Sequence, residues 1–351
     1  MRRFNSGRGL QIFGEIRTRY YGTDYGRFCA RGASASGGNS GRGLFKTMAE
    51  KFIIIDGNAL LHRAWHALPP LTTPSGEPVN AAYGFTLILM KALKDIRPAY
   101  AAVTFDRKEK TFRHEMYKEY KATRVKQPDE LYAQIPIIKK IVTAFGLPIF
   151  EKERFEADDV IATICKNEEV NRPDVESIVV TGDMDTLQLV DDNTKVYALR
   201  KGITDTVIYD EAAVFLKYGL RPDQLNDFKA MRGDPSDNIP GAKGIGEVGA
   251  AALIKEFGTI EKMYEAVERN DERLGKFKPR IIEILKKEKE NVFLGKKLVT
   301  LVSDAPIEFH LGDCVIKINP QDVSAIFKEL GFTSLLKKVD ELAGGAQSNL
   351  L

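Results

Sequence analysis

The chain of 351 residues has only three cysteines, Cys29, Cys165 and Cys314, which lie far apart in no spacing typical of a metal site. This usage is typical of a reducing compartment and excludes a disulfide framework. No apolar run reaches the roughly 18 residues that a membrane-spanning helix needs. With 43% hydrophobic residues, the chain can instead form one large or two ordinary globular domains.

Excess positive charge is missing from most of the chain. Residues 1–47 carry eight Arg and one Lys against Glu15 and Asp24, a net charge of +7, so the chain's total of +3 leaves −4 for the remainder. A net-acidic body is not typical of a non-specific polyanion binder, so any phosphate-handling site must group its acids locally. The Gly, Ser and Arg content of residues 1–47 predicts a disordered tail. Three interpretations of this tail stay open: sequence upstream of a true start at Met48, an organellar transit peptide, or a nucleic-acid-binding tail.

Short β-branched, apolar runs alternate with amphipathic helical patterns from Lys51 onward. This alternation predicts an α/β fold with a mostly parallel central sheet and helices on both faces. The run KFIIID is typical of a strand buried on both faces. The predicted strands are 51–56, 99–106, 147–151, 177–183, 194–199 and 314–318, and the predicted helices are 80–95, 129–145, 156–165, 185–190, 247–258 and 322–331.

Three predicted strands end in an aspartate, at Asp56, Asp106 and Asp183. The carboxyl ends of parallel strands meet at one edge of a sheet, where ligands bind, so these carboxylates should share one rim. A single Asp there is often only a turn or a helix cap. Several uncompensated carboxylates raise one another's pKa and oppose folding, which favours a bound cation. The same rim should also carry Asp185 and, at the start of the helix in RFEADDVIATIC, Glu156, Asp158 and Asp159.

The helix dipole is a competing explanation for the acids at 156–159. An acid in the first turn of a helix stabilises it by roughly 0.3–1 kcal/mol, whereas two carboxylates about 4 Å apart repel by up to roughly 4 kcal/mol. The dipole can therefore account for one or two acids, but three converging acids favour a cation. All candidate ligands are oxygen donors, which disfavours zinc and favours Mg²⁺, with Mn²⁺ as a substitute. Two such ions would clamp a phosphate for in-line attack, so the pattern predicts phosphodiester or phosphomonoester chemistry.

A Gly/Pro-rich loop, RGDPSDNIPGAKGIG, contains two more acids, Asp234 and Asp237, and precedes the helix predicted at 247–258. Its glycines allow backbone N–H groups to approach a ligand, and a helix N-terminus is a ready phosphate site. A plain helix–loop–helix turn would show a similar pattern. Together with the acidic stretch, the loop favours a helix-hairpin-helix element that grips one DNA strand by its backbone. The predicted DNA-binding positions are Lys243, Gly244, Ile245 and Gly246.

A basic segment with interleaved aromatic residues, RKEKTFRHEMYKEYKATRVKQP, follows Asp106 at residues 107–128. Cations neutralise phosphates, and aromatic faces stack on unpaired bases. A solvated helix with charge pairs one turn apart would have a similar composition, but the position beside the acidic rim favours nucleic acid. The basic and aromatic residues of this segment include Arg113, Tyr117, Lys118, Tyr120, Lys121 and Arg124.

Five motifs, in this order, resemble the 5′ nuclease domain of bacterial DNA polymerase I, of the flap endonuclease family, over about residues 50–310. They are FIIIDGNALLHRAWHAL, VTFDRKEKTFRHEMYKEYKATR, FEADDVIAT, VVTGDMDTLQLV and RGDPSDNIPGAKGIGEVGAAALI. The resemblance implies a PIN/5′ nuclease-like core, a helical arch formed by the basic segment, and a helix-hairpin-helix DNA-binding subdomain. It divides the chain into a tail at 1–47, a nuclease part with the arch at 48–215, a DNA-binding part at 216–310 and an extension at 311–351.

The resemblance also implies roles for the matched residues. The first metal group would be Asp56, Asp106, Glu156 and Asp158. The second would be Asp183, Asp185 and Asp234, with Asp158 shared and with Asp159 and Asp237 in supporting roles. In the arch, Lys121 and Arg124 would contact the scissile phosphate, with Arg113 as a helper and Tyr120 positioning the terminal nucleotides. The glycine hairpin at 244–246 would hold duplex DNA, with K⁺ bound by its backbone.

The function expected from the resemblance is a structure-selective 5′→3′ exonuclease and 5′ flap endonuclease with two Mg²⁺ ions, used in primer removal and repair. Its substrates would be DNA with 5′ flaps, nicks or frayed 5′ ends, and RNA primers on DNA. A monomer is expected, without membrane association, either free-standing beside a separate DNA polymerase or as a fragment of a longer polymerase. The expected location is the bacterial cytoplasm at the nucleoid, or an organelle if residues 1–47 are a transit peptide. Two alternatives stay open: a PIN-like ribonuclease and a non-catalytic binder of flap DNA.

Overall fold

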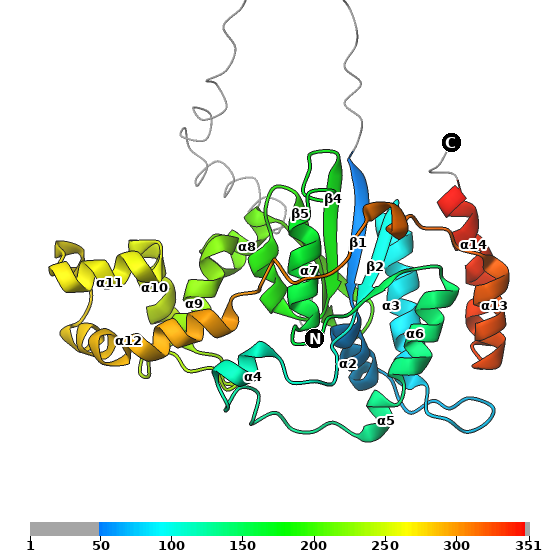
Figure 1. Cartoon of the computed structure of the whole chain (residues 1–351), viewed down its shortest axis with the longest axis horizontal. Coiled ribbons are helices and arrows are strands. Elements are labelled where there is room, and N and C mark those ends of the chain that lie inside the picture. Colours follow the sequence, from blue (N-terminus) through cyan, green and yellow to red (C-terminus); the bar gives the residue numbers. More distant parts are fainter. Residues whose placement is uncertain (1–48, 348–351) are drawn as a thin grey trace, which may run out of the picture. The chain divides into compact units, whose positions relative to one another are not determined.

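The centre of the protein is a six-stranded sheet with the strand order β3-β2-β1-β4-β5-β6 (Figure 1). The computed structural model describes residues 49–347, with side chains up to residue 342, so the tail predicted at 1–47 lies outside the described residues. Neighbouring strands from β3 to β5 pair in parallel, and β6 pairs antiparallel with β5. The predicted mostly parallel α/β fold is therefore confirmed. The strands are β1 (Glu50–Asp56), β2 (Tyr100–Thr104), β3 (Ile149–Phe150), β4 (Val175–Thr181), β5 (Thr194–Lys201) and β6 (Asp205–Tyr209).

The register of the central strands aligns their carboxyl ends. β1 lies between β2 and β4, and it pairs Asp56 with Thr104 on one side and Ile55 with Val180 on the other. The segments that leave β2 and β4 carry Asp106 and Asp183 two residues further on. Parallel pairing thus brings three carboxylates from distant parts of the sequence to the same edge.

The side chains of β1 alternate between two hydrophobic cores, one on each face of the sheet. Phe52 and Ile54 belong to one core, Ile53 and Ile55 belong to the other, and all four are fully buried. This is why the run is apolar throughout instead of alternating with polar residues. The helices that contribute to the Ile53 core are α2 (Gly57–Ala67), α3 (Asn80–Ile96), α5 (Asp129–Tyr132), α6 (Ile135–Ala144), α13 (Pro320–Glu329) and α14 (Leu336–Gln347).

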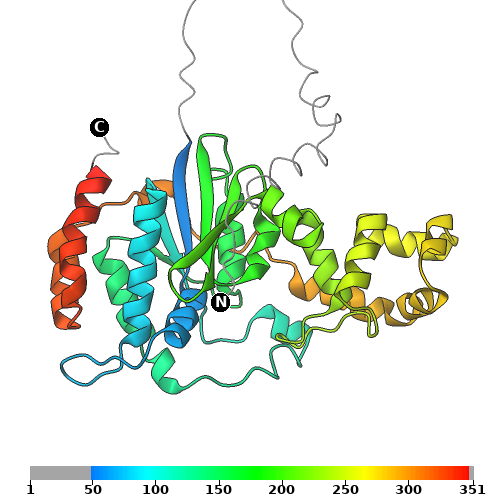
Figure 2. The same cartoon turned by 180° about the vertical axis from the view of Figure 1, so that it is seen from behind.

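The core on the other face of the sheet, which contains Phe52 and Ile54, includes α7 (Ala157–Lys166). It extends into the helical part of the chain at residues 184–299, which Figures 1 and 2 show from both sides. The 21-residue helix α12 (Pro279–Val299) packs along α9 (Leu225–Arg232). Gly295 makes this approach possible, because a Cβ there would lie 3.2 Å from the Ala230 carbonyl oxygen of α9 and 2.5 Å from that of Pro240 in the loop after it. The elements of this part are η2 (Met184–Leu189), α8 (Glu211–Tyr218), η3 (Pro222–Gln224), α9 (Leu225–Arg232), α10 (Glu247–Phe257), α11 (Ile260–Arg269), η4 (Glu272–Lys276) and α12 (Pro279–Val299).

After α12 the chain returns to the sheet. The Phe309 ring packs against Phe52 and Phe150, with ring centroids 6.1 and 5.5 Å apart. The short η5 (Leu311–Cys314) follows, and α13, η6 (Thr333–Leu335) and α14 then pack on the Ile53 face. Residues 311–342 therefore contribute to the cores on the two faces of the sheet.

Several predicted elements differ from the structure. The strand predicted at 314–318 is wrong, because Val315 forms only an isolated bridge with Tyr100. The helix predicted at 129–145 is divided into α5 and α6, and Pro136 stands in the first turn of α6, where its missing N–H costs nothing. The basic segment, expected as a helical arch, contains one short helix, α4 (Phe112–Met116), and otherwise consists of turns and irregular backbone.

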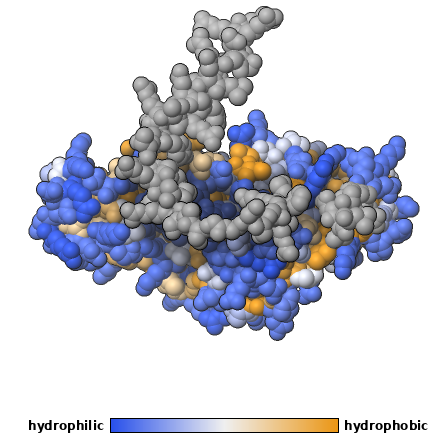
Figure 3. Space-filling model, turned by 90° about the horizontal axis from the view of Figure 1, so that it is seen from above, coloured by the Kyte–Doolittle hydropathy of each residue, from blue (hydrophilic) through white to orange (hydrophobic). Residues whose placement is uncertain are grey.

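Within residues 49–347, no helix is both long enough and apolar enough to cross a bilayer. Figure 3 shows a mostly hydrophilic face, on which apolar residues form separate patches.

Candidate active site

Asp56 lies at the centre of the carboxylate edge, at the junction of β1 and α2. Its Oδ1 accepts from the Ala59 N–H at 2.9 Å, which caps α2, and its Oδ2 accepts from the Thr181 hydroxyl at 2.7 Å. The side chain is buried, and burial together with the charges of Asp106 and Asp183 raises its pKa to about 7, against the two hydrogen bonds that lower it. Two hydrogen bonds thus hold the Asp56 carboxylate in place, but no basic side chain is among the groups that shift its pKa.

Asp158 and Asp106 complete the part of the edge that lies beside Asp56. Burial and the charges of Asp56, Asp183, Asp106 and Glu156 raise the pKa of Asp158 well above its usual value. Asp106 is anchored through Oδ1 to the Ala157 N–H and through Oδ2 to the Asn58 amide, each at 2.7 Å. Strand ends and the N-terminus of α7 therefore bring these carboxylates within electrostatic reach of one another, as the sequence predicted.

A second group of acids surrounds Lys229 of α9. The ammonium of Lys229 contacts Asp185 and lies 2.9 Å from Asp234 Oδ2. Burial would raise the pKa of Asp234, but hydrogen bonds from Ser236 and the charge of Lys229 lower it to about 2. Burial and the charge of Asp183 raise the pKa of Asp185 to about 6, despite Lys229. The lysine thus compensates only part of the negative charge.

Asp183 lies between the two groups of acids. Its Oδ1 accepts from the Asp185 N–H at 2.9 Å, and its own N–H donates to the Thr181 hydroxyl at 2.9 Å. Its charge raises the pKa values of Asp56, Asp158 and Asp185. The two groups therefore form one continuous electrostatic cluster.

Arg113 and Asp159 form a buried ion pair, which was not expected from the sequence. Their side chains are 1% and 0% exposed, and two N–H···O bonds of 2.6 and 2.7 Å join them. The guanidinium also donates to the carbonyls of Leu298 and Thr300, at 2.9 and 3.1 Å. The predicted contact of Arg113 with DNA is wrong for this conformation, because its donors are used inside the protein.

The basic segment at residues 107–128 forms ion pairs with acids of the site. Lys121 Nζ lies 2.8 Å from Glu156 Oε1, and Arg124 Nη2 lies 2.5 Å from Asp237 Oδ1. Tyr120 is 4% exposed, and its hydroxyl donates to Glu156 Oε2 at 3.1 Å. Burial would raise the pKa of Glu156, but Lys121, Arg113 and Tyr120 lower it. The predicted stacking of Tyr120 on nucleotides is not available here, whereas Lys118 is exposed and Tyr117 packs partly buried against the core.

The glycine hairpin lies at the start of α10. Gly246 is the N-cap of α10, and Gly244 has φ = 106°, a conformation that disfavours any residue with a Cβ. Lys243 is exposed, while the Ile245 side chain is 4% exposed and belongs to the core. Only the backbone of Ile245 could therefore contact a ligand.

Sequence reasoning missed three residues that shape the site: Asn58, Thr181 and Lys229. Asn58 and Thr181 lie within two residues of predicted acids, so proximity in the sequence could have indicated them. Lys229 reaches Asp185 only because α9 folds back onto η2, so it had no local signal. In residues 49–342, no group of three His, Cys, Asp or Glu side chains is arranged as a ready ligand set. Several acids instead face Lys121, Arg124 or Lys229.

The raised pKa values predict how stability changes with pH in EDTA. Asp56 and Asp185 have folded-state pKa values of about 7 and about 6 against 3.8, and that of Asp158 is also raised, so the folded chain binds these protons more tightly. The stability that proton binding by these three carboxyl groups contributes is therefore lost as the pH rises, and for Asp185 and Asp56 this loss is complete above about pH 6 and 7. His62 and His114 have lowered pKa values and oppose this trend with smaller shifts. We expect a higher Tm at pH 5.5 than at pH 8 by scanning calorimetry; a higher Tm at pH 8 would contradict it.

Comparison with known families identifies the class of protein. The 5′-3′ exonuclease N-terminal resolvase-like domain matches residues 51–219, and the 5′-3′ exonuclease C-terminal SAM fold matches residues 220–323. DNA polymerase I of Bacillus subtilis (strain 168) is 42% identical over 304 residues, which cover 86% of this chain and 34% of that protein. DNA polymerase I of Bacillus caldotenax is 40% identical over 294 residues, covering 84% and 33%. The chain belongs to the 5′-3′ exonuclease family, as predicted. It spans about a third of the length of these relatives.

Solved structures confirm the predicted 5′ nuclease-like fold. The T5 5′-exonuclease with divalent metal ions (zinc) has a TM-score of 0.56 at 22% identity, covering 85% of this chain and all of that chain. The catalytic core of Rad2 in complex with DNA substrate has a TM-score of 0.55 at 16% identity, covering 85% and 93%.

Proposed function

We propose that the chain is a structure-selective 5′→3′ exonuclease and 5′ flap endonuclease that hydrolyses DNA phosphodiesters with two divalent cations. The observation that carries this proposal is the arrangement of two carboxylate groups at one sheet edge, covered by Lys121 and Arg124 from a basic segment. Carboxylates attract cations, whereas the covering side chains attract phosphate. Such a site brings a phosphodiester and metal ions to the same place.

The carboxylate groups fit divalent cations. Asp56 and Asp158 have pKa values raised by burial and by neighbouring acids, so they lack sufficient positive charge. The Lys229 ammonium lies between Asp185 and Asp234, which supports this position as one that holds positive charge. Oxygen donors favour Mg²⁺, with Mn²⁺ able to substitute. The proposed ligands are Asp56, Asp106, Glu156 and Asp158 for one ion, and Asp158, Asp183, Asp185 and Asp234 for the other.

Bound cations would supply Lewis-acid stabilisation of the charge that develops on the phosphate. The protein would contribute Lys121 and Arg124, which neutralise the phosphate from the opposite side. Lys118, exposed in the same segment, would hold the single-stranded 5′ end. Backbone N–H groups at 244–246, together with Lys243, would hold one strand of the duplex, with K⁺ as a proposed backbone-bound ion.

The relatives support DNA as the substrate. The Rad2 core was solved with DNA substrate, the T5 5′-exonuclease with divalent metal ions, and the curated relatives are bacterial DNA polymerases. We propose that the chain acts as a monomer on 5′ flaps, nicks, frayed ends and RNA primers, beside or as part of a DNA polymerase in bacterial replication and repair. We propose that the nuclease function lies in residues 48–215 and the DNA-binding function in residues 216–310, with residues 311–351 as a C-terminal extension.

The test is cleavage of an internally labelled double-flap DNA by the full chain, with Mg²⁺ and with EDTA. We expect a short 5′ product with Mg²⁺ and a rate at least about a thousandfold lower in EDTA, because the acids alone repel the phosphate. A flap of RNA with the same sequence serves as the comparison. Tight binding without cleavage in both Mg²⁺ and Mn²⁺ would contradict the proposal, and preferential cleavage of RNA would favour a PIN-like ribonuclease.

A further inference from the structure

The loop at residues 234–241 is joined to the backbone of the basic segment by one backbone hydrogen bond and one from the Asn238 side chain. The Lys121 N–H donates to the Asp237 carbonyl at 2.8 Å, and the Asn238 amide donates to the Glu119 carbonyl at 2.7 Å. The loop itself is closed by two backbone hydrogen bonds of 3.0 and 2.8 Å between Asp234 and Ile239. A closed loop thus holds a segment that has little regular structure of its own.

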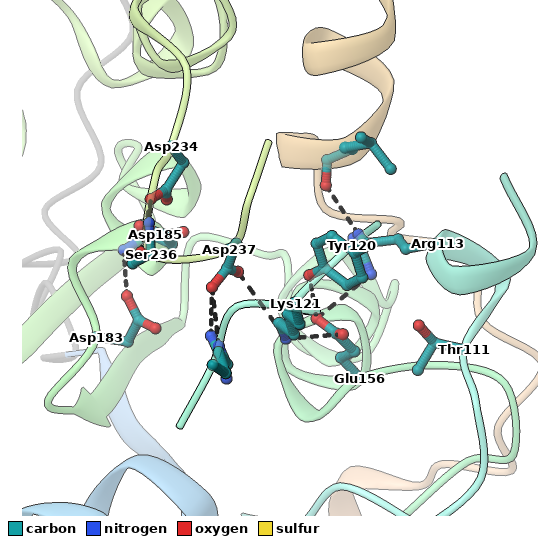
Figure 4. A network of polar contacts seen from close by, with 12 residues as sticks. Thr111, Arg113, Tyr120, Lys121, Glu156, Asp183, Asp185, Asp234, Ser236 and Asp237 are labelled. Carbon is teal, nitrogen blue, oxygen red and sulfur yellow. Dashed lines mark hydrogen bonds and ion pairs between the residues drawn. The ribbon is translucent and has the colours of Figure 1, made fainter. Parts of the chain in front are cut away.

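The carboxylate of Asp237 faces the cations of that segment (Figure 4). Its Oδ1 accepts from Arg124 Nε at 3.0 Å and from Arg124 Nη2 at 2.5 Å, and its Oδ2 lies 4.0 Å from Lys121 Nζ. The Asp237 side chain is 11% exposed, whereas that of Arg124 is 52% exposed. Both oxygens of Asp237 are therefore oriented toward the basic segment, whereas Asp234 from the same loop faces Lys229.

Backbone conformation indicates that these contacts hold the turn in shape. Lys121 and Asn238 have φ values of 56° and 55°, in the left-handed region. Asn adopts this region readily, but a Lys does so against a steric cost. The conformation of Lys121 therefore depends on its contacts with the loop, and loss of those contacts should let the turn open.

We propose that Asp237 and Asn238 form a latch that holds the basic segment over the carboxylate groups before DNA binds. Asp237 is then a positioning residue for Arg124 and Lys121, not a metal ligand. A DNA phosphate would replace Asp237 as the partner of Arg124, so the latch competes with substrate for the same guanidinium. This inference rests on the proposed function, because it assigns Arg124 to the phosphate.

The first test is the affinity of the DNA-free full chain for Mn²⁺, measured by titration calorimetry. Asp237→Asn should bind Mn²⁺ within about threefold of the parent, whereas Asp234→Asn should lose about tenfold or more. Asp174→Asn is the matched control, because Asp174 forms an exposed pair with Arg172 at the start of β4, away from the carboxylate edge. A loss for Asp237→Asn equal to that for Asp234→Asn would overturn the proposal.

The second test is limited trypsin digestion of the same DNA-free variants, followed by mass spectrometry of cuts at Lys118, Lys121 and Arg124. Asn238→Ala removes the hydrogen bond to the Glu119 carbonyl without changing charge, and Asp237→Asn weakens the pair with Arg124. Each should speed these cuts about two- to tenfold, as expected from losing one such contact, while Asp174→Asn should not. Unchanged digestion in both loop variants would overturn the latch.

The third test is binding of fluorescent 5′-flap DNA in EDTA, followed by anisotropy. Asp237→Asn should bind the DNA about three- to tenfold more tightly than the parent. Its affinity should also fall more steeply with salt concentration, by the amount expected for about one additional phosphate contact. Asp174→Asn should change the affinity less than twofold. Equal or weaker binding by Asp237→Asn would count against competition for Arg124. The Mn²⁺ and trypsin measurements need no DNA cleavage, so they decide the latch even if the proposed nuclease activity fails.

Discussion

Replacing Asp158 by Asn is expected to abolish cleavage while making the metal-free protein more stable. Asp158 experiences repulsion from Asp56, Asp183, Asp106 and Glu156, and burial further raises its pKa. An amide of the same shape removes one member of this repelling group, so in EDTA at pH 8 the Tm should rise by a few degrees. The same change removes the carboxylate proposed to be shared by both cations, so flap cleavage in Mg²⁺ should fall at least about a thousandfold.

A folding defect would lower both the Tm and the cleavage rate. A higher Tm together with a lower cleavage rate therefore distinguishes the predicted effect from a folding defect. Calorimetry in EDTA gives the Tm, and single-turnover cleavage of 5′-flap DNA gives the rate. Asp174→Asn serves as the charge-matched control and should alter neither quantity appreciably, since its pair with Arg172 is exposed. Cleavage by Asp158→Asn within tenfold of the parent would contradict the proposed role, and a lowered Tm in EDTA would contradict the repulsion.

Replacing Arg113 by Met is expected to have the largest effect on folding. The change would leave Asp159 charged and buried without its partner, and the carbonyls of Leu298 and Thr300 would each lose a donor. Removing one member of a buried ion pair costs about 3–5 kcal/mol of the free energy of unfolding. Urea unfolding, followed by circular dichroism, measures this loss.

The matched control for Arg113→Met is Arg172→Met. Arg172 also pairs with an aspartate, but its side chain is 44% exposed, so the loss should stay below about 1 kcal/mol. The double variant Arg113→Met with Asp159→Leu should recover part of the lost stability, because no unpaired charge stays buried. A loss of less than about 1 kcal/mol for Arg113→Met alone would show that the buried pair does not stabilise the fold.

The carboxylate edge could be predicted because it depends on local patterns. A buried parallel strand is apolar throughout, its final residue lies at the ligand-binding edge, and Asp56 marks that end for β1. The acids at 156–159 were likewise visible as a helix start, and the structure places Glu156 at the N-cap of α7. These features require only the identity and spacing of neighbouring residues.

The partners of the basic residues could not be predicted from local patterns. Arg113 appeared equivalent to Lys118 and Arg124 in a charged segment, yet burial sets it apart. That burial depends on Leu298 and Thr300, which lie at the site because α12 packs against α9. Lys229 could not be assigned for the same reason, because its partners lie on different elements.

The errors in secondary structure have a similar cause. The apolar run at 314–318 has the composition of a strand, but Val315 bridges only Tyr100 and Pro320 soon begins α13. The edge strand β6, which was not predicted, has mostly partly exposed residues and a single neighbour, so its apolar pattern is weak. Strand formation at both places depends on whether a hydrogen-bonding neighbour is available, which the run itself does not encode.

The return of the chain after α12 affects how this protein can be divided for expression. Asp159 accepts from the Val302 N–H at 2.9 Å, Gln188 exchanges hydrogen bonds with Val299 and Leu301, and the Thr163 hydroxyl accepts from the Ala305 N–H at 3.0 Å. A fragment cut near residue 215 would lack all of these partners, although it would contain every strand of the sheet. The smallest piece that keeps these interior polar groups satisfied must therefore include residue 305, so the part that contains the sheet and the helical part form one folding unit.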